Sequence, residues 1–212
     1  MKRAVVFGGG RIADYTSLCF THQAGDYIIC ADSGIIHCEE LGLKADLWVG
    51  DFDSCDFDTC INLPCARNVS IKRLNPVKDM SDTEYALDYA VQNGYDSLVL
   101  IGGIGTRLDH SLSNLYLTEK YFKIGIKLTV IDENNVISFV KNSSCLVTKS
   151  RFKYVSILPL EDCVVSCRGF YYNLSYEKLF RNSTRAISNE LSDDTGTITI
   201  HDGSAFIIES ID

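Results

Sequence analysis

The sequence contains little proline and no long apolar run. Only 3 of its 212 residues are proline and 15 are glycine, so the composition excludes a fibrous repeat or a low-complexity chain. No apolar stretch approaches the roughly 18 residues that a membrane-spanning helix needs. Near the start of the chain, Ala4–Phe7 is also much shorter than the apolar core of a secretory signal peptide. We therefore expect a globular, cytoplasmic protein with no membrane partner.

Cysteine is abundant, but the arrangement that would indicate a structural zinc site is missing. The nine cysteines include no Cys-x-x-Cys pair, because Cys55, Cys60 and Cys65 recur every five residues and Cys163 and Cys167 are four apart. The number is odd, no export signal precedes them, and most lie within apolar runs. We expect reduced, buried thiols.

Positive charge is also in short supply. The chain has 20 basic and 28 acidic side chains, a formal net charge of −8 and a pI near 5.0. Such a field repels nucleic acid and anionic membranes, so neither is expected as a partner. Most of the excess acid lies in residues 1–140, with 12 basic and 19 acidic side chains. A polyanionic ligand would therefore need a cation close to its binding site.

Short β-rich runs alternate with helical patterns over the first two thirds of the chain. The runs typical of strands buried on both faces are Arg3–Phe7, Tyr27–Ala31, Leu47–Val49, Ser97–Ile101 and Lys127–Ile131. A capping box at Ser81–Glu84 predicts the start of one helix, which ends before Gly94. A second helix carries Leu108, Leu112 and Leu115 and ends near Gly125.

From about residue 135 onward the helical signal fades and short β-rich runs replace it. These runs are Val136–Val140, Cys145–Thr148, Tyr154–Leu158, Cys163–Cys167, Thr197–His201 and Ala205–Ile208. Strands at this spacing are typical of a sandwich. We predict an α/β domain over residues 1–140, with a mostly parallel, Rossmann-like sheet flanked by helices, followed by a smaller all-β sandwich over residues 141–212.

A glycine-rich segment follows the first predicted strand. Residues Gly8–Ala13 fit the pattern G-x-G-x-x-A, and Asp32 ends the second strand about twenty residues later. This pattern is found in dinucleotide-binding folds, where the glycines allow a phosphate to approach the backbone and the aspartate binds a ribose. The alternative is a tight turn followed by an aspartate at a strand end, and other segments of this chain carry stronger signals than this match.

The strongest chemical signal is acidic. Asp51 and Asp53 follow the strand Leu47–Val49, and residues i and i+2 of an extended segment project to the same face. Two adjacent carboxylates repel each other unless a cation neutralises them, and Mg²⁺ prefers such oxygen ligands. Lys78–Asp82 adds a cation and two further carboxylates at a helix start, where phosphate binds readily. The alternative for Asp51 and Asp53 is a solvated acidic turn. The alternative for Asp82 is that it only complements the helix dipole.

A third polar segment runs from Gly102 to His110. Gly102 and Gly103 permit close backbone approach, Arg107 offers a bidentate donor, and Asp109 and His110 are possible proton acceptors. The Walker pattern G-x-x-x-x-G-K-[ST] is absent. His110 by itself is equally explained as an ordinary helix histidine.

These segments together resemble the thiamine pyrophosphokinase family. The order and spacing match over nearly the whole chain at Asp32, Gly50–Ser54, Lys78–Asp82, Arg107–His110, Gly169–Leu174 and Ser188–Asn189. The resemblance implies a homodimeric enzyme that transfers the pyrophosphoryl group of ATP to thiamine, giving thiamine diphosphate and AMP. It also implies that residues 1–140 bind nucleotide and metal, and that residues 141–212 bind thiamine and dimerise.

The resemblance further implies a role for individual residues. Asp51, Asp53 and Asp82 would hold Mg²⁺, and together with Asp109 they would form the catalytic set. The ATP-binding residues would be Asp32, Lys78, Ser81, Gly102, Gly103 and Arg107. Asp109, Ser188 and Asn189 would face thiamine. The chain departs from the family pattern at Ser33 and Thr106, where glycines are usual.

Three functions of other classes compete with this interpretation. A haloacid-dehalogenase-like phosphatase also uses Asp-x-Asp, although Cys55 stands where a threonine or valine is usual. A nucleotide-sugar glycosyltransferase can hold its metal with the same pair, but it leaves Lys78–Asp82 without a role. A non-catalytic nucleotide-binding module would need the glycine loops without the carboxylates.

Overall fold

The computed structural model describes residues 1–77 and 79–212, and these form two compact units, Met1–Glu133 and Asn134–Asp212. The division lies seven residues before the boundary expected from the sequence. The physical reason is strand β7 (Asn135–Lys141), which pairs along its whole length with β13 (Ser204–Ser210). This pairing makes β7 part of the second unit.

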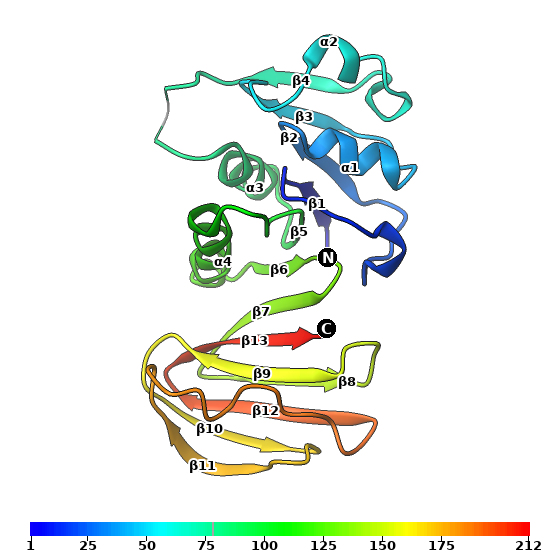
Figure 1. Ribbon diagram of the computed structural model, residues 1–212. Helices are drawn as coiled ribbons and strands as arrows, with labels where there is room; N and C mark the ends of the chain where they lie inside the picture. Colours follow the sequence, from blue (N-terminus) through cyan, green and yellow to red (C-terminus); the bar gives the residue numbers. More distant parts are fainter. Residues whose placement is uncertain (78) are drawn as a thin grey trace. The chain divides into compact units, whose positions relative to one another are not determined.

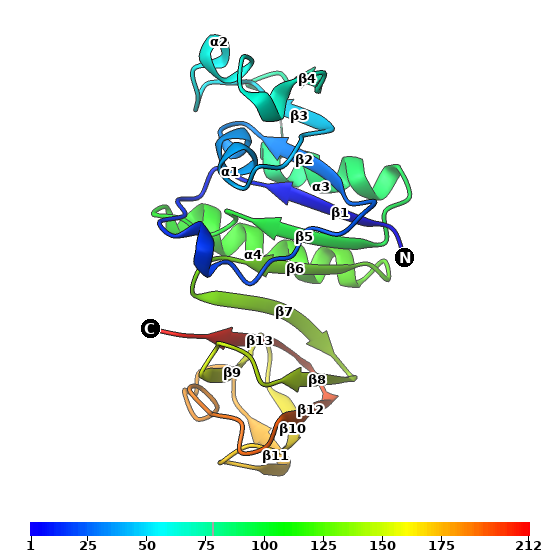
Figure 2. The same cartoon turned by 90° about the vertical axis from the view of Figure 1, so that its right-hand side faces the viewer.

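The first unit is built on a parallel sheet with strand order β4-β3-β2-β1-β5-β6. The strands are β1 (Arg3–Phe7), β2 (Tyr27–Ala31), β3 (Leu47–Gly50), β4 (Ser70–Arg73), β5 (Ser97–Ile101) and β6 (Lys127–Ile131). Figure 2 shows β2, β1 and β5 side by side with their arrowheads at one edge of the sheet. The central strands are apolar on both faces because helices cover both, and Ala4–Phe7 is completely buried.

Helices flank this sheet on both sides (Figure 1). α1 (Gly34–Glu40) lies on one face, and α3 (Asp82–Gln92) and α4 (Leu108–Phe122) lie on the other. The N-cap half of the predicted capping box is present, since the hydroxyl oxygen of Ser81 accepts a hydrogen bond from the backbone N–H of Glu84 at 3.1 Å. The Glu84 carboxylate binds Lys120 at 2.8 Å. The remaining short elements are η1 (Tyr15–Ser17), α2 (Phe57–Cys60) and η2 (Pro64–Ala66).

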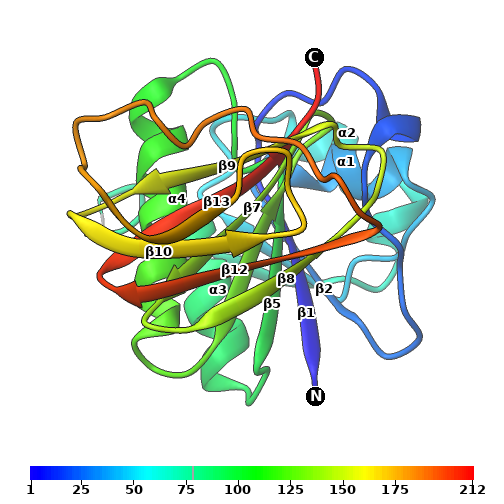
Figure 3. The same ribbon diagram turned by 90° about the horizontal axis from the view of Figure 1, so that it is seen from below.

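The second unit is an antiparallel sandwich. One sheet contains β7, β13 and β9 (Tyr154–Pro159). The other has the order β11-β10-β12-β8, formed by β11 (Leu174–Leu179), β10 (Cys163–Arg168), β12 (Thr195–Asp202) and β8 (Ser144–Thr148). Figure 3 shows β10 and β12 side by side and running in opposite directions.

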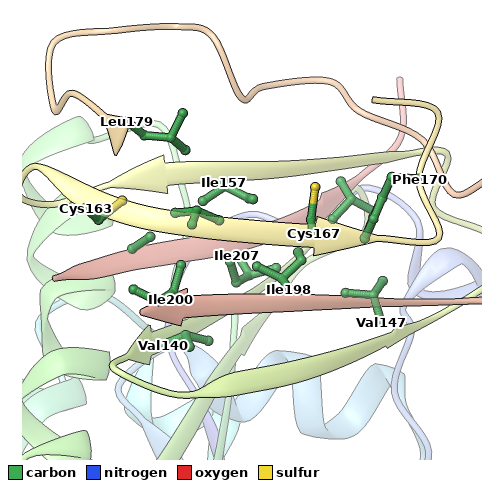
Figure 4. Close-up of a cluster of buried hydrophobic side chains, with 13 residues drawn as sticks. Val140, Val147, Ile157, Cys163, Cys167, Phe170, Leu179, Ile198, Ile200 and Ile207 are labelled. Carbon is green, nitrogen blue, oxygen red and sulfur yellow. The ribbon is translucent and has the colours of Figure 1, made fainter. Parts of the chain in front are cut away.

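The core of the sandwich lies between its two sheets. Figure 4 shows Ile157 and Ile207 from the first sheet packed with Cys167, Ile198 and Ile200 from the second. All nine cysteines of the chain are free thiols, and six of them are buried. The α/β fold followed by an all-β sandwich is therefore confirmed.

Two strands have no counterpart among the sequence predictions. All four residues of the edge strand β4 are exposed, and in β11 only Leu179 is buried. An edge strand is held by backbone pairing and needs no apolar face, so its sequence carries little signal. No described helix is long and apolar enough to cross a membrane.

Candidate active site

A polar cavity of about 500 Å³ opens where the strands of the first unit end. This is the edge at which open α/β sheets bind ligands. Its lining comes from segments far apart in the sequence: Gly9–Arg11, Ala31–Ser33, Asp51, Asp53, Ser54, Ser81–Thr83, Gly102, Gly103, Gly105–Arg107, His110 and Asn114. The topology thus joins the three polar segments singled out from the sequence.

Three carboxylates meet in this cavity. Asp32, Asp51 and Asp53 each present an oxygen atom, and these atoms lie within 4.8 Å of one another. Asp82, at the start of α3, lines the same cavity, and its negative charge acts on the Asp32 carboxyl group. The sequence predicts that Asp32 binds the nucleotide. In the structure, its carboxyl group lies with those of Asp51 and Asp53.

The backbone around Asp32 holds it in an uncommon conformation. Its φ of 47° is in the left-handed region, as is the φ of 64° at Phe52. The backbone N–H of Asp32 donates to Val49 O at 2.9 Å, and the Trp48 indole donates to Asp32 O at 2.8 Å. The backbone N–H of Phe52 donates to Asp32 Oδ1 at 3.1 Å. These bonds direct the Asp32 carboxyl group toward the loop that carries the other two carboxylates.

Gly50 makes this approach possible. A Cβ atom added at Gly50 would lie 2.0 Å from Asp32 Oδ1. Only a residue without a side chain can occupy the end of β3 while the Asp32 carboxyl group lies beside it.

The electrostatics of the cluster favour a bound cation. Burial, followed by the negative charge of Asp82, raises the pKa of Asp32 from 3.8 to about 7. A buried carboxyl group beside other carboxylates ionises reluctantly. A divalent cation would remove that penalty, and the all-oxygen donor set matches the hard ions Mg²⁺ and Ca²⁺.

Two glycine loops form part of the cavity wall: the first, residues 8–10, follows β1, and the second, residues 102–105, follows β5. The backbone N–H of Gly10 donates to Gly102 O at 2.8 Å, and the backbone N–H of Gly8 donates to Ile101 O at the same distance. A Cβ atom at Gly10 would lie 2.2 Å from Ile104 O, so a larger residue would force the loops apart. The loops therefore present bare backbone to the cavity.

His37 supports the first of these loops, a role that no sequence pattern predicts. It is 7% exposed, and its Nε2 atom lies 2.7 Å from Gly10 O, which can only accept, so Nε2 carries the proton. In the neutral ring, Nδ1 then accepts from the Tyr15 hydroxyl at 2.7 Å. Burial lowers the pKa of His37, which favours this neutral form. A lone histidine in an amphipathic segment gave no signal for this role.

α4 and the residue before it contribute an amide and a cation, Asn114 and Arg107. Arg107 lines the cavity and donates to both carboxylate oxygens of Asp109, at 3.3 and 2.7 Å. This bond to Arg107 lowers the pKa of Asp109 to about 2. Asn114 donates to Gly103 O at 2.7 Å and so fixes the second glycine loop.

The structure brings together most of the predicted catalytic and ATP-binding residues. Those that line the cavity are Asp32, Asp51, Asp53, Ser81, Asp82, Gly102, Gly103 and Arg107. Asp109 is exposed and does not line it. Lys78 lies outside the described residues.

Ser188 and Asn189 line a different cavity, within the second unit. This cavity has a volume of about 220 Å³ and is mostly apolar, with Val155, Ile157 and Phe170 among its lining residues. The Asn189 amide group donates to Tyr172 O at 2.8 Å and accepts from the Tyr172 N–H at 3.1 Å. Ser188 has a left-handed φ of 56°. Asn189 therefore holds the Tyr172 backbone beside this cavity.

The context that a dinucleotide fingerprint requires is not found after β1. Residues 8–20 are all described, and they contain only the 3₁₀ turn η1. The fingerprint depends on a helix N-terminus that faces the pyrophosphate. The glycine segment is instead one of two loops that wall the acidic cavity.

Comparisons with known proteins agree with the motif resemblance. A family model described as the thiamin pyrophosphokinase catalytic domain matches residues 21–130, and one described as its vitamin B1 binding domain matches residues 143–204. A thiamine pyrophosphokinase of Bacillus subtilis is 30% identical over 98% of each chain.

Solved structures show the same similarity. The crystal structure of the Bacillus subtilis thiamine pyrophosphokinase aligns with this chain at a TM-score of 0.88 and 29% identity. The alignment covers 100% of each chain. The structure from Geobacillus thermodenitrificans has a TM-score of 0.85 and 30% identity, and covers 100% of this chain and 98% of its own.

Proposed function

Because the chain belongs to the thiamine pyrophosphokinase family, we propose that the acidic cavity of its first unit transfers the pyrophosphoryl group of ATP to the hydroxyl group of thiamine, with AMP as the leaving nucleotide. The observation that carries this proposal is the meeting of Asp32, Asp51 and Asp53 at the same sheet edge as two glycine loops. Phosphoryl transfer depends on positioning and charge neutralisation more than on covalent chemistry, and this cavity offers both.

Asp32, Asp51 and Asp53, with Asp82 beside them, are the residues that would hold Mg²⁺. When bound, the ion neutralises charge on phosphate oxygens. The donor set fits it, because all the ligands are carboxylate oxygens, and the burial that raises the pKa of Asp32 makes its charge costly unless a cation is near.

The glycine loops and Arg107 bind and orient the phosphates in this proposal. Gly9, Gly10 and Gly103 line the cavity without side chains, so phosphate oxygens can approach their backbone. Arg107 supplies a forked donor that matches phosphate geometry. Its exposed ion pair with Asp109 contributes little stability, so a phosphate can replace the carboxylate at small cost.

Thiamine recognition is assigned to Asp109, Ser188 and Asn189. The low pKa of Asp109 keeps this carboxylate ionised, and an anion suits the cationic ring of thiamine. The second cavity is largely apolar with a few polar groups, which is typical of small-ligand sites. Ser188 is the better candidate for a direct contact, because Asn189 already holds Tyr172.

A homodimer is proposed on the basis of exposed aromatic residues in the second unit. Tyr171, Tyr172 and Tyr176 are 69%, 75% and 71% exposed. Tyrosine is enriched in interfaces because it combines a large apolar area with a polar tip. Light scattering at micromolar concentration is expected to give twice the chain mass, and a fully active monomer would contradict the assignment. The nine free thiols support a reducing, cytoplasmic location.

The identity of the nucleotide product tests the reaction directly. The pure protein is incubated with ATP, Mg²⁺ and thiamine, and nucleotides are separated by chromatography. We expect AMP and thiamine diphosphate in equal amounts. ADP would indicate a simple kinase, and ATP binding without turnover would indicate a binding module. In a parallel incubation with a phosphate monoester, release of inorganic phosphate would indicate the phosphatase.

A pair of matched variants tests the acidic site. Asp53→Asn keeps the side-chain shape but removes one charge, so turnover should fall by roughly a hundredfold, as for the loss of one strong electrostatic contact. Asp58→Asn is the control, because Asp58 is exposed, lies five residues away and does not line the cavity. Equal activity of the two variants would overturn the proposed site.

A further inference from the structure

Arg11 is a cation that lines the acidic cavity and that the motifs do not assign. It follows Gly10 directly and its side chain is exposed. In the described part of the chain, the basic side chains that line this cavity are Arg11 and Arg107, together with His110.

The two arginines differ in their partners. Arg107 binds both carboxylate oxygens of Asp109. Among residues 1–77 and 79–212, no acidic side chain forms an ion pair with Arg11. The Arg11 guanidinium therefore keeps its full set of donors available to a ligand.

The backbone is fixed on both sides of Arg11. Before it, the Gly10 N–H donates to Gly102 O, and Gly10 O accepts from His37 at 2.7 Å. After it, Ile12 is 7% exposed, and the N–H groups of Ala13 and Asp14 donate to one Glu133 carboxylate oxygen at 2.6 and 2.8 Å. Binding thus needs to order only the side chain of Arg11, which keeps the entropic cost small.

The charge balance of the cavity makes a cation necessary wherever a polyphosphate binds. Its wall carries four carboxylates, and the whole chain has a net charge of −8. A polyphosphate entering such a field needs cations beside it. Arginine is suited to this because its planar fork matches phosphate oxygens.

We propose that Arg11 binds the polyphosphate chain of the substrate, as an additional phosphate-binding residue at the first glycine loop. This inference rests on the proposed function for the identity of the substrate. Binding of a polyphosphate by Arg11 can be measured without turnover.

The test uses Arg11→Gln and Arg11→Lys, with Arg67→Gln as the matched control. Arg67 is exposed in the same unit and lies outside the cavity, so its variant makes the same change in net charge. Binding of ATP, inorganic tripolyphosphate and adenosine is measured by calorimetry with Mg²⁺, and melting temperatures show whether each variant is folded.

We expect Arg11→Gln to weaken binding of ATP and tripolyphosphate by roughly ten- to a hundredfold, the loss typical of a charged hydrogen bond. Adenosine binding should not change. Arg11→Lys should recover part of the loss, because lysine restores the charge but not the fork. Arg67→Gln should match the wild type.

Three results would overturn the proposal. These are equal effects of Arg11→Gln and Arg67→Gln, an equal loss for ATP and adenosine, or a folded wild-type protein that does not bind tripolyphosphate. The proposed function fails separately, if the wild type binds tripolyphosphate through Arg11 and yet forms no AMP.

Discussion

Gly50→Ala is expected to disable the acidic site while leaving the fold in place. Gly50 ends β3, and a Cβ atom there would lie 2.0 Å from Asp32 Oδ1 and 2.8 Å from Asp32 Cγ. Either the carboxyl group or the loop after β3 must move. Because Asp51 follows Gly50 directly and Asp53 lies two residues further on, both movements disturb the same cluster.

The size of the effect follows from the geometry. Protein Cβ atoms essentially never approach another heavy atom closer than 3.0 Å, so relief of the clash requires a displacement of about 1 Å. Mg²⁺ requires near-ideal octahedral geometry at roughly 2.0–2.1 Å, so a ligand displaced that far no longer coordinates well. A misplacement of about 1 Å can cost roughly a hundredfold in rate. We therefore expect turnover to fall about as far as in Asp53→Asn.

The assay compares Gly50→Ala with Gly42→Ala by AMP formation, Mg²⁺ titration and thermal unfolding. Gly42 has a left-handed φ of 64°, and no atom lies within 4 Å of an added Cβ. Its replacement should cost about 1–2 kcal/mol of stability through backbone strain and should leave turnover unchanged. If Gly50→Ala keeps the Mg²⁺ affinity and activity of Gly42→Ala, the inferred role of the Asp32 carboxyl position is wrong.

Three further predictions follow from the same contacts. The pKa of Asp32 is about 7 in the fold against 3.8 for a free group, so its protonated form stabilises the fold fully below pH 3.8, and this stability is lost as pH rises to 7. Relative to Asp32→Asn, the metal-free melting temperature should therefore fall between about pH 4 and pH 7 and level off above it, and Mg²⁺ should restore it at pH 8. His37→Phe removes two hydrogen bonds. It should lower the free energy of unfolding by roughly 1–3 kcal/mol and raise the KM for ATP, and Tyr15→Phe should have a smaller effect. An unchanged free energy of unfolding in urea would contradict this. Asn189→Ala frees the Tyr172 backbone and should lower both the melting temperature and the affinity for thiamine. Ser188→Ala should lower the thiamine affinity alone. Thermal melts and calorimetry measure the two effects.

Much of the fold could be read from local patterns. The buried parallel strands are near-continuous apolar runs, and Ser81 and Gly94 mark the ends of α3 through local capping chemistry. The edge strands β4 and β11 were missed, because such strands depend on pairing with a distant neighbour and have little apolar pattern of their own. The unit boundary was displaced for the same reason, since only the pairing with β13 assigns β7 to the sandwich.

The residues of the candidate site also divide into those that local patterns predict and those that long-range contacts bring together. The pair Asp51 and Asp53, the glycine loops and Arg107 were recognisable because each follows the end of a strand, and parallel strands end at one edge of their sheet. The grouping of Asp32 with that pair depends on the parallel pairing of β2 with β3 and on the missing side chain of Gly50. The support that His37 gives to Gly10 spans 27 residues.

The sequence by itself determined the kinds of groups available and the elements that carry them, because capping, apolar periodicity and strand-end placement are local properties of the chain. Only the tertiary structure decided which of these groups meet. Asp32 lies beside Asp51 and Asp53, and His37 supports the loop at Gly10. Within the described residues, no acidic side chain forms an ion pair with Arg11, so its donors are available to a ligand. Hydrogen bonds, ion pairs and pKa shifts depend on distances of a few ångströms between residues far apart in the chain, and the packed fold alone sets those distances.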